Sequence, residues 1–279
     1  MPELPEVEAA RALAERVAAG RRIVRAWCAR DGIVFEGASP ARWKRALIGR
    51  RFVRAHRHGK HLWLELDERP WPCLHFGMAG NLHVPRTRAA KLVSSGRHSS
   101  NDAWPPRFAK LWLTFEGGAE LVMSDARRLG RIRLRQDPVA EPPISLLGFD
   151  ALRSVPSPTR FFALVHERAA PVKALLLDQS FAAGVGNWIA DEVLYQARIA
   201  PARPARSLTS EEVGRLRTAL GRVVRTAVGV GADSDRFPRG WLFHRRWGRQ
   251  VGSVTAGGEQ IRHDTIGGRT TAWVPRRQR

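Results

Sequence analysis

The sequence predicts an α+β protein in which an antiparallel β-sandwich with flanking helices is followed by a helical domain carrying a C-terminal β-hairpin. Three observations lead to this prediction. Apolar and polar residues alternate through much of residues 21–135, the period of strands with one buried face. Apolar residues recur at helical spacing between residues 159 and 230. The closing segment, Gly267 to Gln278, mixes glycine, β-branched and aromatic residues, as expected of a hairpin that ends in a basic tail.

The first element is an amphipathic helix of roughly 15 residues. Val7, Ala10, Leu13 and Val17 recur at helical spacing, and Gly20 is suited to end the helix. The simplest interpretation is a structural helix and nothing more.

The residue at position 2 allows a second interpretation. Because Pro2 is small, we expect the initiator methionine to be removed, which leaves a secondary amine at the terminus. An α-amino group has a pKa of about 7.7–8.0, so a usable fraction is neutral at pH 7. A neutral amine can attack carbon and form an iminium, as a Schiff-base lysine does. Glu3, its neighbour, could supply the acid.

The β-sandwich is predicted from six apolar–polar segments separated by Gly, Asp and Pro. They are residues 21–29, 50–66, 71–84, 109–118, 119–125 and 130–136.

Three places in this half of the chain attract attention. Lys60 follows Gly59 just before an apolar strand, where a solvated lysine is the simpler explanation. Met78 lies between glycines in a tight turn, where a methionine need not belong to the core. Two arginines and an apolar residue, at positions 127–129, form a turn that would suit a wedge pushed into a base stack, although a solvated turn is the simpler interpretation.

The chain is expected to divide into four parts: a β-sandwich domain (1–136), a Pro- and Ser-rich linker (137–158), a helical domain (159–230) and the hairpin region (231–279). Residues 84–107 are predicted to form a long polar loop.

Helical periodicity in the second half is clear over residues 159–168, 172–179, 187–198 and 209–228. Between the second and third of these, Gly184 and Gly186 permit a sharp turn, and Asn187 could cap the next helix. Backbone N–H groups at such a helix start bind phosphate well. Thr209 and Glu212 have the spacing of a capping box.

The charge points to a polyanionic partner. The 279 residues include 47 Lys and Arg against 26 Asp and Glu, for a net charge of +21. Arginine's rigid fork pairs well with phosphate, so nucleic acid is the first expectation. A genome rich in arginine codons is the alternative explanation.

The two cysteines, Cys28 and Cys73, exclude a disulfide scaffold and a four-cysteine zinc site. No segment approaches the roughly 18 apolar residues of a membrane span, and no basic-then-apolar leader opens the chain. We therefore expect a cytoplasmic, nucleoid-associated protein.

Four segments in order resemble one family, the formamidopyrimidine-DNA glycosylase/endonuclease VIII family of base-excision repair enzymes. "PELPEVE" at residues 2–8 resembles the signature of its formamidopyrimidine branch. "SDARRLG" (124–130) resembles the DPRRFG loop, and "LLLDQSFAAGVGNWIADEVLYQARI" (175–199) is similar to the helix–two-turn–helix motif. "GGRTTAWVPRRQ" (267–278) resembles the C-terminal finger, GGR-x-T-x-x-C-P-x-C-Q.

The resemblance implies catalytic roles for five residues. Pro2 would displace the damaged base at C1′ and form the Schiff base, Glu3 would be the general acid, and Glu6 a supporting carboxylate. Lys60 matches the lysine credited with β-elimination and phosphate contact. Arg269 matches the finger arginine, which grips phosphate near the lesion and assists δ-elimination.

It also implies residues that bind DNA. The trio that fills the gap left by a flipped nucleotide would be Met78, Arg127 and Leu129. Phosphate contacts and the anion-binding helix start would come from Arg128, Lys173, Gly186 and Asn187.

Two departures from the family pattern affect the expected function. The finger's zinc ligands fall on Val254, Gly257, Val274 and Arg277, so the resemblance predicts a zincless finger of the plant and fungal type, with no cofactor and no metal. The segment 229–240 is short and lacks the STLRDY-like stretch that covers a flipped 8-oxoguanine in many members. We therefore expect formamidopyrimidines, further-oxidised guanine or oxidised pyrimidines to be better substrates than 8-oxoguanine.

The leading hypothesis is a monomeric, bifunctional glycosylase/AP lyase acting on damaged double-stranded DNA, since reading one lesion requires no half-site symmetry. The alternatives are an endonuclease VIII-like enzyme for oxidised pyrimidines and a catalytically idle protein that binds damage.

Overall fold

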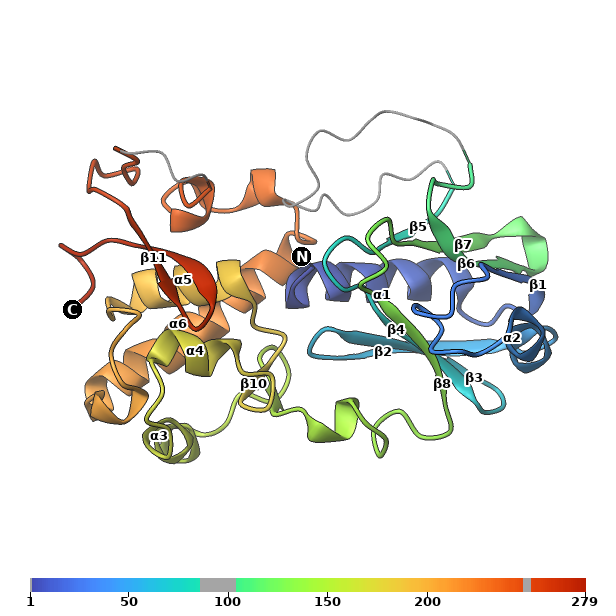
Figure 1. The fold of residues 1–279 in the computed structure, drawn as a ribbon, viewed down its shortest axis with the longest axis horizontal. Coiled ribbons are helices and arrows are strands. Elements are labelled where there is room, and N and C mark those ends of the chain that lie inside the picture. Colours follow the sequence, from blue (N-terminus) through green and yellow to red (C-terminus); the bar gives the residue numbers. More distant parts are fainter. Residues whose placement is uncertain (1, 86–103, 248–251) are drawn as a thin grey trace. The chain divides into compact units, whose positions relative to one another are not determined.

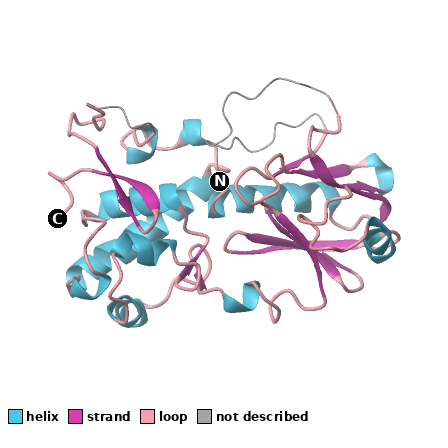
Figure 2. Cartoon of the chain, in the orientation of Figure 1, coloured by secondary structure: helices cyan, strands magenta, loops and turns pink. Residues whose placement is uncertain are grey.

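The computed structural model describes residues 2–85, 104–247 and 252–279, and it divides into two compact units. Unit 1 comprises residues 1–146 and 231–234, and unit 2 comprises residues 147–230 and 235–279. Strands predominate in unit 1 and helices in unit 2 (Figure 2). The division after residue 146 lies inside the segment predicted as a linker. Most of the predicted polar loop, residues 86–103, lies outside the described residues.

Unit 1 contains two four-stranded antiparallel sheets with the orders β1-β6-β7-β5 and β2-β3-β4-β8. Its elements are α1 (Leu4–Ala18), β1 (Ile23–Cys28), α2 (Pro40–Leu47), β2 (Phe52–His58), β3 (His61–Leu66), β4 (Trp71–His75), β5 (Asn81–His83), β6 (Ala109–Phe115), β7 (Glu120–Ser124) and β8 (Arg131–Arg135). The predicted β-sandwich is confirmed, because alternation places one face of each sheet in a shared apolar core.

Helix α1 closes this core and contacts strands of both sheets (Figure 1). Val7, Ala10 and Leu13 are buried and Val17 is partly buried against the same core, which confirms the apolar stripe expected from the sequence. The carboxylate of Glu15 accepts a hydrogen bond from the backbone N–H of Ala55 at 2.6 Å. This bond fixes the helix against strand β2.

Helix α2 was missed by the sequence prediction, which assigned no element to residues 30–49. Ser39 caps it by accepting a hydrogen bond from the backbone N–H of Arg42 at 3.3 Å, and Pro40 begins it. Trp43 and Leu47 are fully buried against the sandwich core.

The described residues of unit 2 form four α-helices and a hairpin. Its elements are β9 (Phe149–Asp150), α3 (Pro158–His166), α4 (Val172–Leu177), β10 (Ala182–Ala183), α5 (Asn187–Ala197), α6 (Ser210–Gly229), β11 (Arg262–Ile266) and β12 (Arg269–Trp273). The predicted helices are confirmed to within a few residues, and the hairpin β11–β12 is antiparallel with Ile266 opposite Arg269. None of the described helices is long and apolar enough to cross a membrane.

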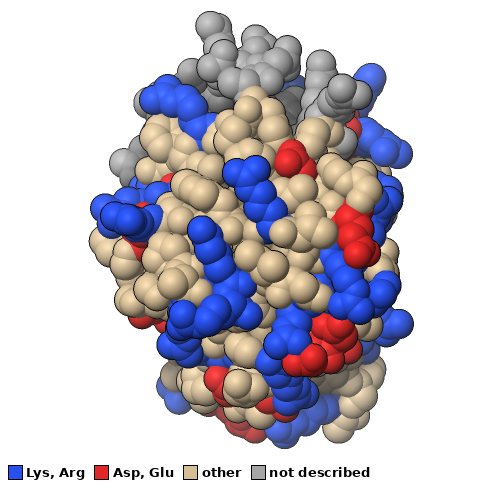
Figure 3. Space-filling model, turned by 90° about the vertical axis from the view of Figure 1, so that its right-hand side faces the viewer, with Lys and Arg blue, Asp and Glu red and all other residues tan. Residues whose placement is uncertain are grey.

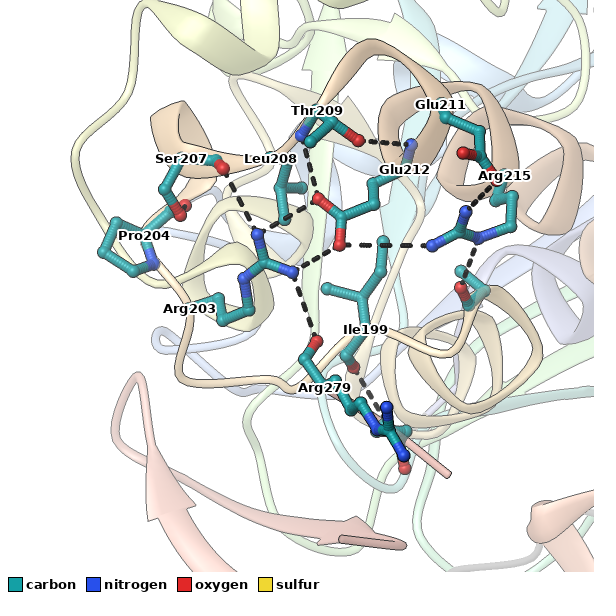
Figure 4. A network of polar contacts seen from close by, with 12 residues as sticks. Ile199, Arg203, Pro204, Ser207, Leu208, Thr209, Glu211, Glu212, Arg215 and Arg279 are labelled. Atoms are coloured by element: carbon teal, nitrogen blue, oxygen red, sulfur yellow. Dashed lines mark hydrogen bonds and ion pairs between the residues drawn. The ribbon is translucent and has the colours of Figure 1, made fainter. Parts of the chain in front are cut away.

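The start of α6 is held by a polar network (Figure 4). Thr209 and Glu212 form the predicted capping box. Arg203 pairs with the Glu212 carboxylate and also donates to the Ser207 carbonyl at 3.2 Å and the Arg279 carbonyl at 3.3 Å. The network therefore links the helix start to the last residue of the chain.

Candidate active site and DNA-binding residues

The residues expected to carry the chemistry begin at the start of α1. Pro2 is buried, Glu3 is the N-cap residue, and Glu6 occupies the third helical position. Glu3 and Glu6 form a reciprocal capping box, in which the Glu6 carboxyl accepts from the Glu3 backbone N–H at 3.1 Å. The helix therefore begins with two buried carboxyl groups directly after Pro2.

Burial changes the proton affinity of the second carboxyl. Desolvation, reinforced by the nearby charge of Glu3, raises the pKa of Glu6 to about 7. Glu6 therefore holds its proton up to near-neutral pH. A site that handles protons near pH 7 is expected to contain such a group.

Lys60 lies in the two-residue turn between β2 and β3. The turn uses Gly59 at a positive φ of 55°, a conformation that glycine adopts without strain. Arg57 is fully buried and donates to the Gly59 carbonyl at 2.9 Å and to the Glu8 carboxylate at 2.7 Å. Since Glu8 is on α1, this ion pair ties the Lys60 turn to the helix that begins at Pro2.

Two turns expected to enter the DNA stack lie against each other in unit 1. A Cβ on Gly77, next to Met78, would lie 2.4 Å from the backbone carbon of Leu129, so only glycine permits this contact. Asp125 holds the second turn by accepting from the backbone N–H of Gly130 at 2.6 Å and of Arg127 at 3.1 Å. Leu129 is 43% exposed at the tip. The turns that carry Met78 and Arg127–Leu129 thus form one packed surface feature.

Arg128, in the same turn, is already engaged by a carboxylate. Its Nε and Nη2 donate to Asp31 at 3.0 and 3.1 Å, and Lys110 donates to the same carboxylate at 2.8 Å. Burial alone would raise the pKa of Asp31, but these hydrogen bonds outweigh it and hold the pKa well below its usual range. Arg128 therefore both braces the turn and leaves its half-exposed guanidinium accessible.

In unit 2 the turn between α4 and α5 is organised by a residue that sequence reasoning missed. The Gln179 amide donates to the carbonyls of Leu177 and Val185 at 2.8 and 2.9 Å and accepts from the Gly184 N–H at 3.1 Å. Gly186, rather than Asn187, is the N-cap of α5. The expectation that Asn187 caps the helix was wrong, because it is the first helical residue.

Asn187 instead reaches the hairpin. Its side-chain Nδ2 donates to the Thr270 carbonyl at 2.9 Å. The second amide hydrogen and the backbone N–H groups of the first turn of α5 are the groups that could meet a phosphate.

Lys173 has no exposed surface. Its ammonium pairs with the buried Asp191 carboxylate on α5 and donates to the Asn187 carbonyl at 3.1 Å. In this structure it supports the helix that carries Asn187.

Arg269 stands at the tip of the hairpin. The turn residues Gly267 and Gly268 have φ values of 60° and 70°, which fits a two-residue hairpin loop. Arg269 is exposed, and its guanidinium has no partner among the described residues. It is thus available for an anionic ligand.

The residues at the family's zinc positions do not fit the metal. Val274 is fully buried in a small apolar cluster with Tyr195, Leu242, Ile261 and Ala272, and Arg277 lies over the Tyr195 ring at 4.7 Å. Within residues 2–85, 104–247 and 252–279, no group of three or more His, Cys, Asp or Glu could hold a metal ion.

Aromatic residues from the segment before the hairpin pack against α5. Phe237, Trp241 and Phe243 are buried and surround Trp188 of α5, with ring centroids 5.1–6.5 Å apart. Trp247 is 42% exposed, so it contributes less to this packing than the three buried rings.

Basic side chains are abundant on the surface but do not form one continuous patch in the view of Figure 3. Lys and Arg side chains are spread over that face with carboxylates among them. On this face, charge alone therefore does not mark a binding site.

Comparison with known proteins identifies the family. The family model of the formamidopyrimidine-DNA glycosylase N-terminal domain matches residues 1–132, and that of the H2TH domain matches residues 147–238. The chain is 42% identical over 279 residues to the formamidopyrimidine-DNA glycosylase of Arabidopsis thaliana, covering 100% of this chain and 71% of that protein. It is 36% identical over 292 residues to the Thermus thermophilus enzyme, covering 99% of this chain and 97% of that protein.

Solved structures agree. The MutM (Fpg) protein from Thermus thermophilus superposes with a TM-score of 0.78 at 32% identity, covering 99% of this chain and 98% of that one. Lactococcus lactis Fpg bound non-covalently to DNA containing an AP site gives 0.81 at 22% identity, covering 99% of each chain, which shows a shared fold.

The fold and sequence together define a DNA repair glycosylase. The chain belongs to the formamidopyrimidine-DNA glycosylase family, whose members combine glycosylase and AP lyase activity. The resemblance inferred from the four motifs is thereby confirmed.

Proposed function

We propose that this chain removes oxidised purines from duplex DNA through a Schiff base on Pro2 and then cleaves the strand by β,δ-elimination. Family membership supports the glycosylase and lyase class. The observation that carries the specific proposal is the buried carboxyl pair, Glu3 and Glu6, that begins α1 directly after Pro2. A proton donor and a nitrogen nucleophile are thereby adjacent in the chain.

The proposed chemistry needs no water or metal to cleave the strand. The Pro2 nitrogen attacks C1′ as the base departs with a proton from Glu3. Cleavage of the C1′–O4′ bond then gives the iminium, and the proton that the nitrogen loses passes to O4′. The iminium acidifies the C2′ proton, so removing it expels the 3′ phosphate, and a second elimination expels the 5′ phosphate. Lys60 assists the first elimination and Arg269 the second.

Lesion extrusion is assigned to the paired turns of unit 1. Met78, Arg127 and Leu129 would fill the space that the flipped nucleotide leaves. Their support comes from the Gly77 contact and from Asp125. A damaged base costs less to unstack than an intact pair, which gives a first level of selectivity.

The preferred lesion is proposed from the segment 229–240. Phe237 of this segment is buried against Trp188 and Trp241, so little of the segment is available to cover a flipped base. We propose that formamidopyrimidines and hydantoins are released faster than 8-oxoguanine. Single-turnover rates on matched duplexes test this, and fast release of 8-oxoguanine opposite cytosine would refute it.

The function itself is tested by borohydride trapping on duplexes that contain an abasic site, with mass analysis of the N-terminal peptide. A reduced adduct on Pro2 is expected from the methionine-free protein. Absence of any adduct would refute the enzyme and favour a protein that only binds damage. Faster release of thymine glycol than of any oxidised purine would instead favour the endonuclease VIII-like alternative.

A further inference from the structure

A buried carboxylate occupies the junction between the hairpin and the helices of unit 2. The side chain of Asp191 on α5 is 0% exposed. It accepts from Arg246 Nε at 3.1 Å and Nη2 at 2.6 Å, from the backbone N–H of Ala272 at 3.2 Å, and from the Lys173 ammonium. One carboxylate thus joins α4, α5, the segment before the hairpin and strand β12. We call these residues the Asp191 cluster.

The cluster lies close to Arg269 in the chain. Ala272 is three residues after Arg269 on β12. Thr270, which directly follows Arg269, accepts a hydrogen bond from Asn187 at the start of α5. At the other side of Arg269, a Cβ on Gly267 would lie 3.1 Å from the Ala174 Cβ of α4. The strand that carries Arg269 is therefore fixed to α4 and α5 on both sides of that residue.

The apolar contacts of the hairpin fix its position on the helices less closely than the hydrogen bonds of the Asp191 cluster do. The cluster around Val274 is small, and apolar attraction has no direction. Charge-assisted hydrogen bonds are directional and roughly twice as strong as neutral ones. In a zinc finger a cation fixes the ligands around it, whereas here an anion on α5 fixes donors from three other segments.

We propose that Arg246, acting through Asp191, is a positioning residue that sets the hairpin so that Arg269 can engage DNA. This inference rests on the proposed function, because it assigns Arg269 a phosphate to grip. It assigns to the Asp191 cluster the positioning task that bound zinc performs in other fingers. It also places Lys173 in this cluster, as a second donor to the same carboxylate.

The test uses Arg246 rather than Asp191, because Asp191→Asn would leave two buried cations without a counter-charge and could prevent folding. Arg246→Met retains the apolar length of the side chain and removes its donors. Arg246→Lys retains the charge without the fork. Arg245→Met is the matched control, since Arg245 is adjacent and exposed.

The decisive measurement is a double-mutant cycle on binding to a duplex that contains tetrahydrofuran, an abasic-site analogue. We expect Arg246→Met to weaken binding about tenfold or more, as small misplacements of a positioned group do, and Arg246→Lys to restore part of the loss. In the Arg269→Ala background the same change should cost less than about twofold, because coupled residues are non-additive. An equal loss in both backgrounds, or an equal loss in Arg245→Met, would overturn the proposal.

If Arg246→Met does not fold, the same cycle is run with Arg246→Lys. Borohydride trapping of the unmodified protein is run first. If it gives no adduct, the proposed function has failed, and hydrogen exchange decides the positioning step separately. Faster exchange of residues 262–273 in the Arg246 variant than in the Arg245 control would support that step, and unchanged exchange would overturn it.

Discussion

Glu6 provides a quantitative test of the buried carboxyl pair. The substitution Glu6→Gln preserves the shape of the side chain and leaves an oxygen to accept from the Glu3 backbone N–H. It removes the ionisable group whose pKa is raised by burial from its ordinary 4.5 to about 7. The variant therefore separates the effect of the charge from the effect of the helix cap.

The size and sign of the effect follow from linkage. Between pH 4.5 and about 7 the folded protein keeps a proton that the unfolded chain has released, so wild-type stability falls as pH rises through this window. Each pH unit corresponds to about 1.4 kcal/mol. The penalty is therefore below about 1 kcal/mol at pH 5 and reaches about 3 kcal/mol at pH 8. Glu6→Gln has no such penalty.

The assay is urea unfolding of both proteins at pH 5 and pH 8. The free energy of unfolding of Glu6→Gln relative to wild type should become more favourable by about 2–3 kcal/mol between the two pH values. Glu68→Gln, whose side chain is 64% exposed in the same unit, should show no comparable change. A Glu6→Gln difference that is the same at both pH values would refute the burial argument.

Three further outcomes are expected. Leu129→Ala should change the free energy of unfolding by no more than about 0.5 kcal/mol, because the side chain is exposed. It should slow lesion release about tenfold, since unstacking costs a few kcal/mol. An unchanged single-turnover rate would contradict the proposed role of Leu129. Trp273→Ala removes a 2.6 Å hydrogen bond to Asp264 and should weaken DNA binding. Incubation with a chelator should leave activity unchanged, and stoichiometric zinc in purified protein would contradict this expectation. Asp31→Asn should lower the free energy of unfolding at pH 7 by about 1–3 kcal/mol, because it removes the partner of Arg128. This loss should disappear as pH falls through the folded pKa of Asp31, which lies below its usual range. A loss in thermal unfolding that does not depend on pH would argue against the ion pair.

Much of the fold could be predicted because its signals are local. The alternation of β2 and β3, the apolar stripe of α1 and the capping box at Thr209 each lie within a few consecutive residues. Helix α2 escaped, although Ser39 and Pro40 have the form of a helix start.

The supporting residues of the site could not be predicted, for a different reason. Asp191 and Arg246 are 55 positions apart, and Glu8 and Arg57 are 49 apart. No local pattern distinguishes a buried ion pair of this kind from charges that face solvent. The residues expected to act on DNA were recognisable from motifs, but the partners that hold them required the folded structure.

The close packing of the two turns in unit 1 has a consequence for how damage would be found. The turn that carries Leu129 is pinned by the Gly77 contact, by Asp125 and by the Arg128–Asp31 pair. A turn held at so many points would change shape little when it enters the duplex, so the duplex would have to deform around it. In the proposed complex, the Leu129 turn would enter DNA sequences that bend and unstack easily sooner than it enters stiffer ones. The rate at which the turn enters the duplex would then depend on how easily each base step deforms, before the protein contacts the damaged base.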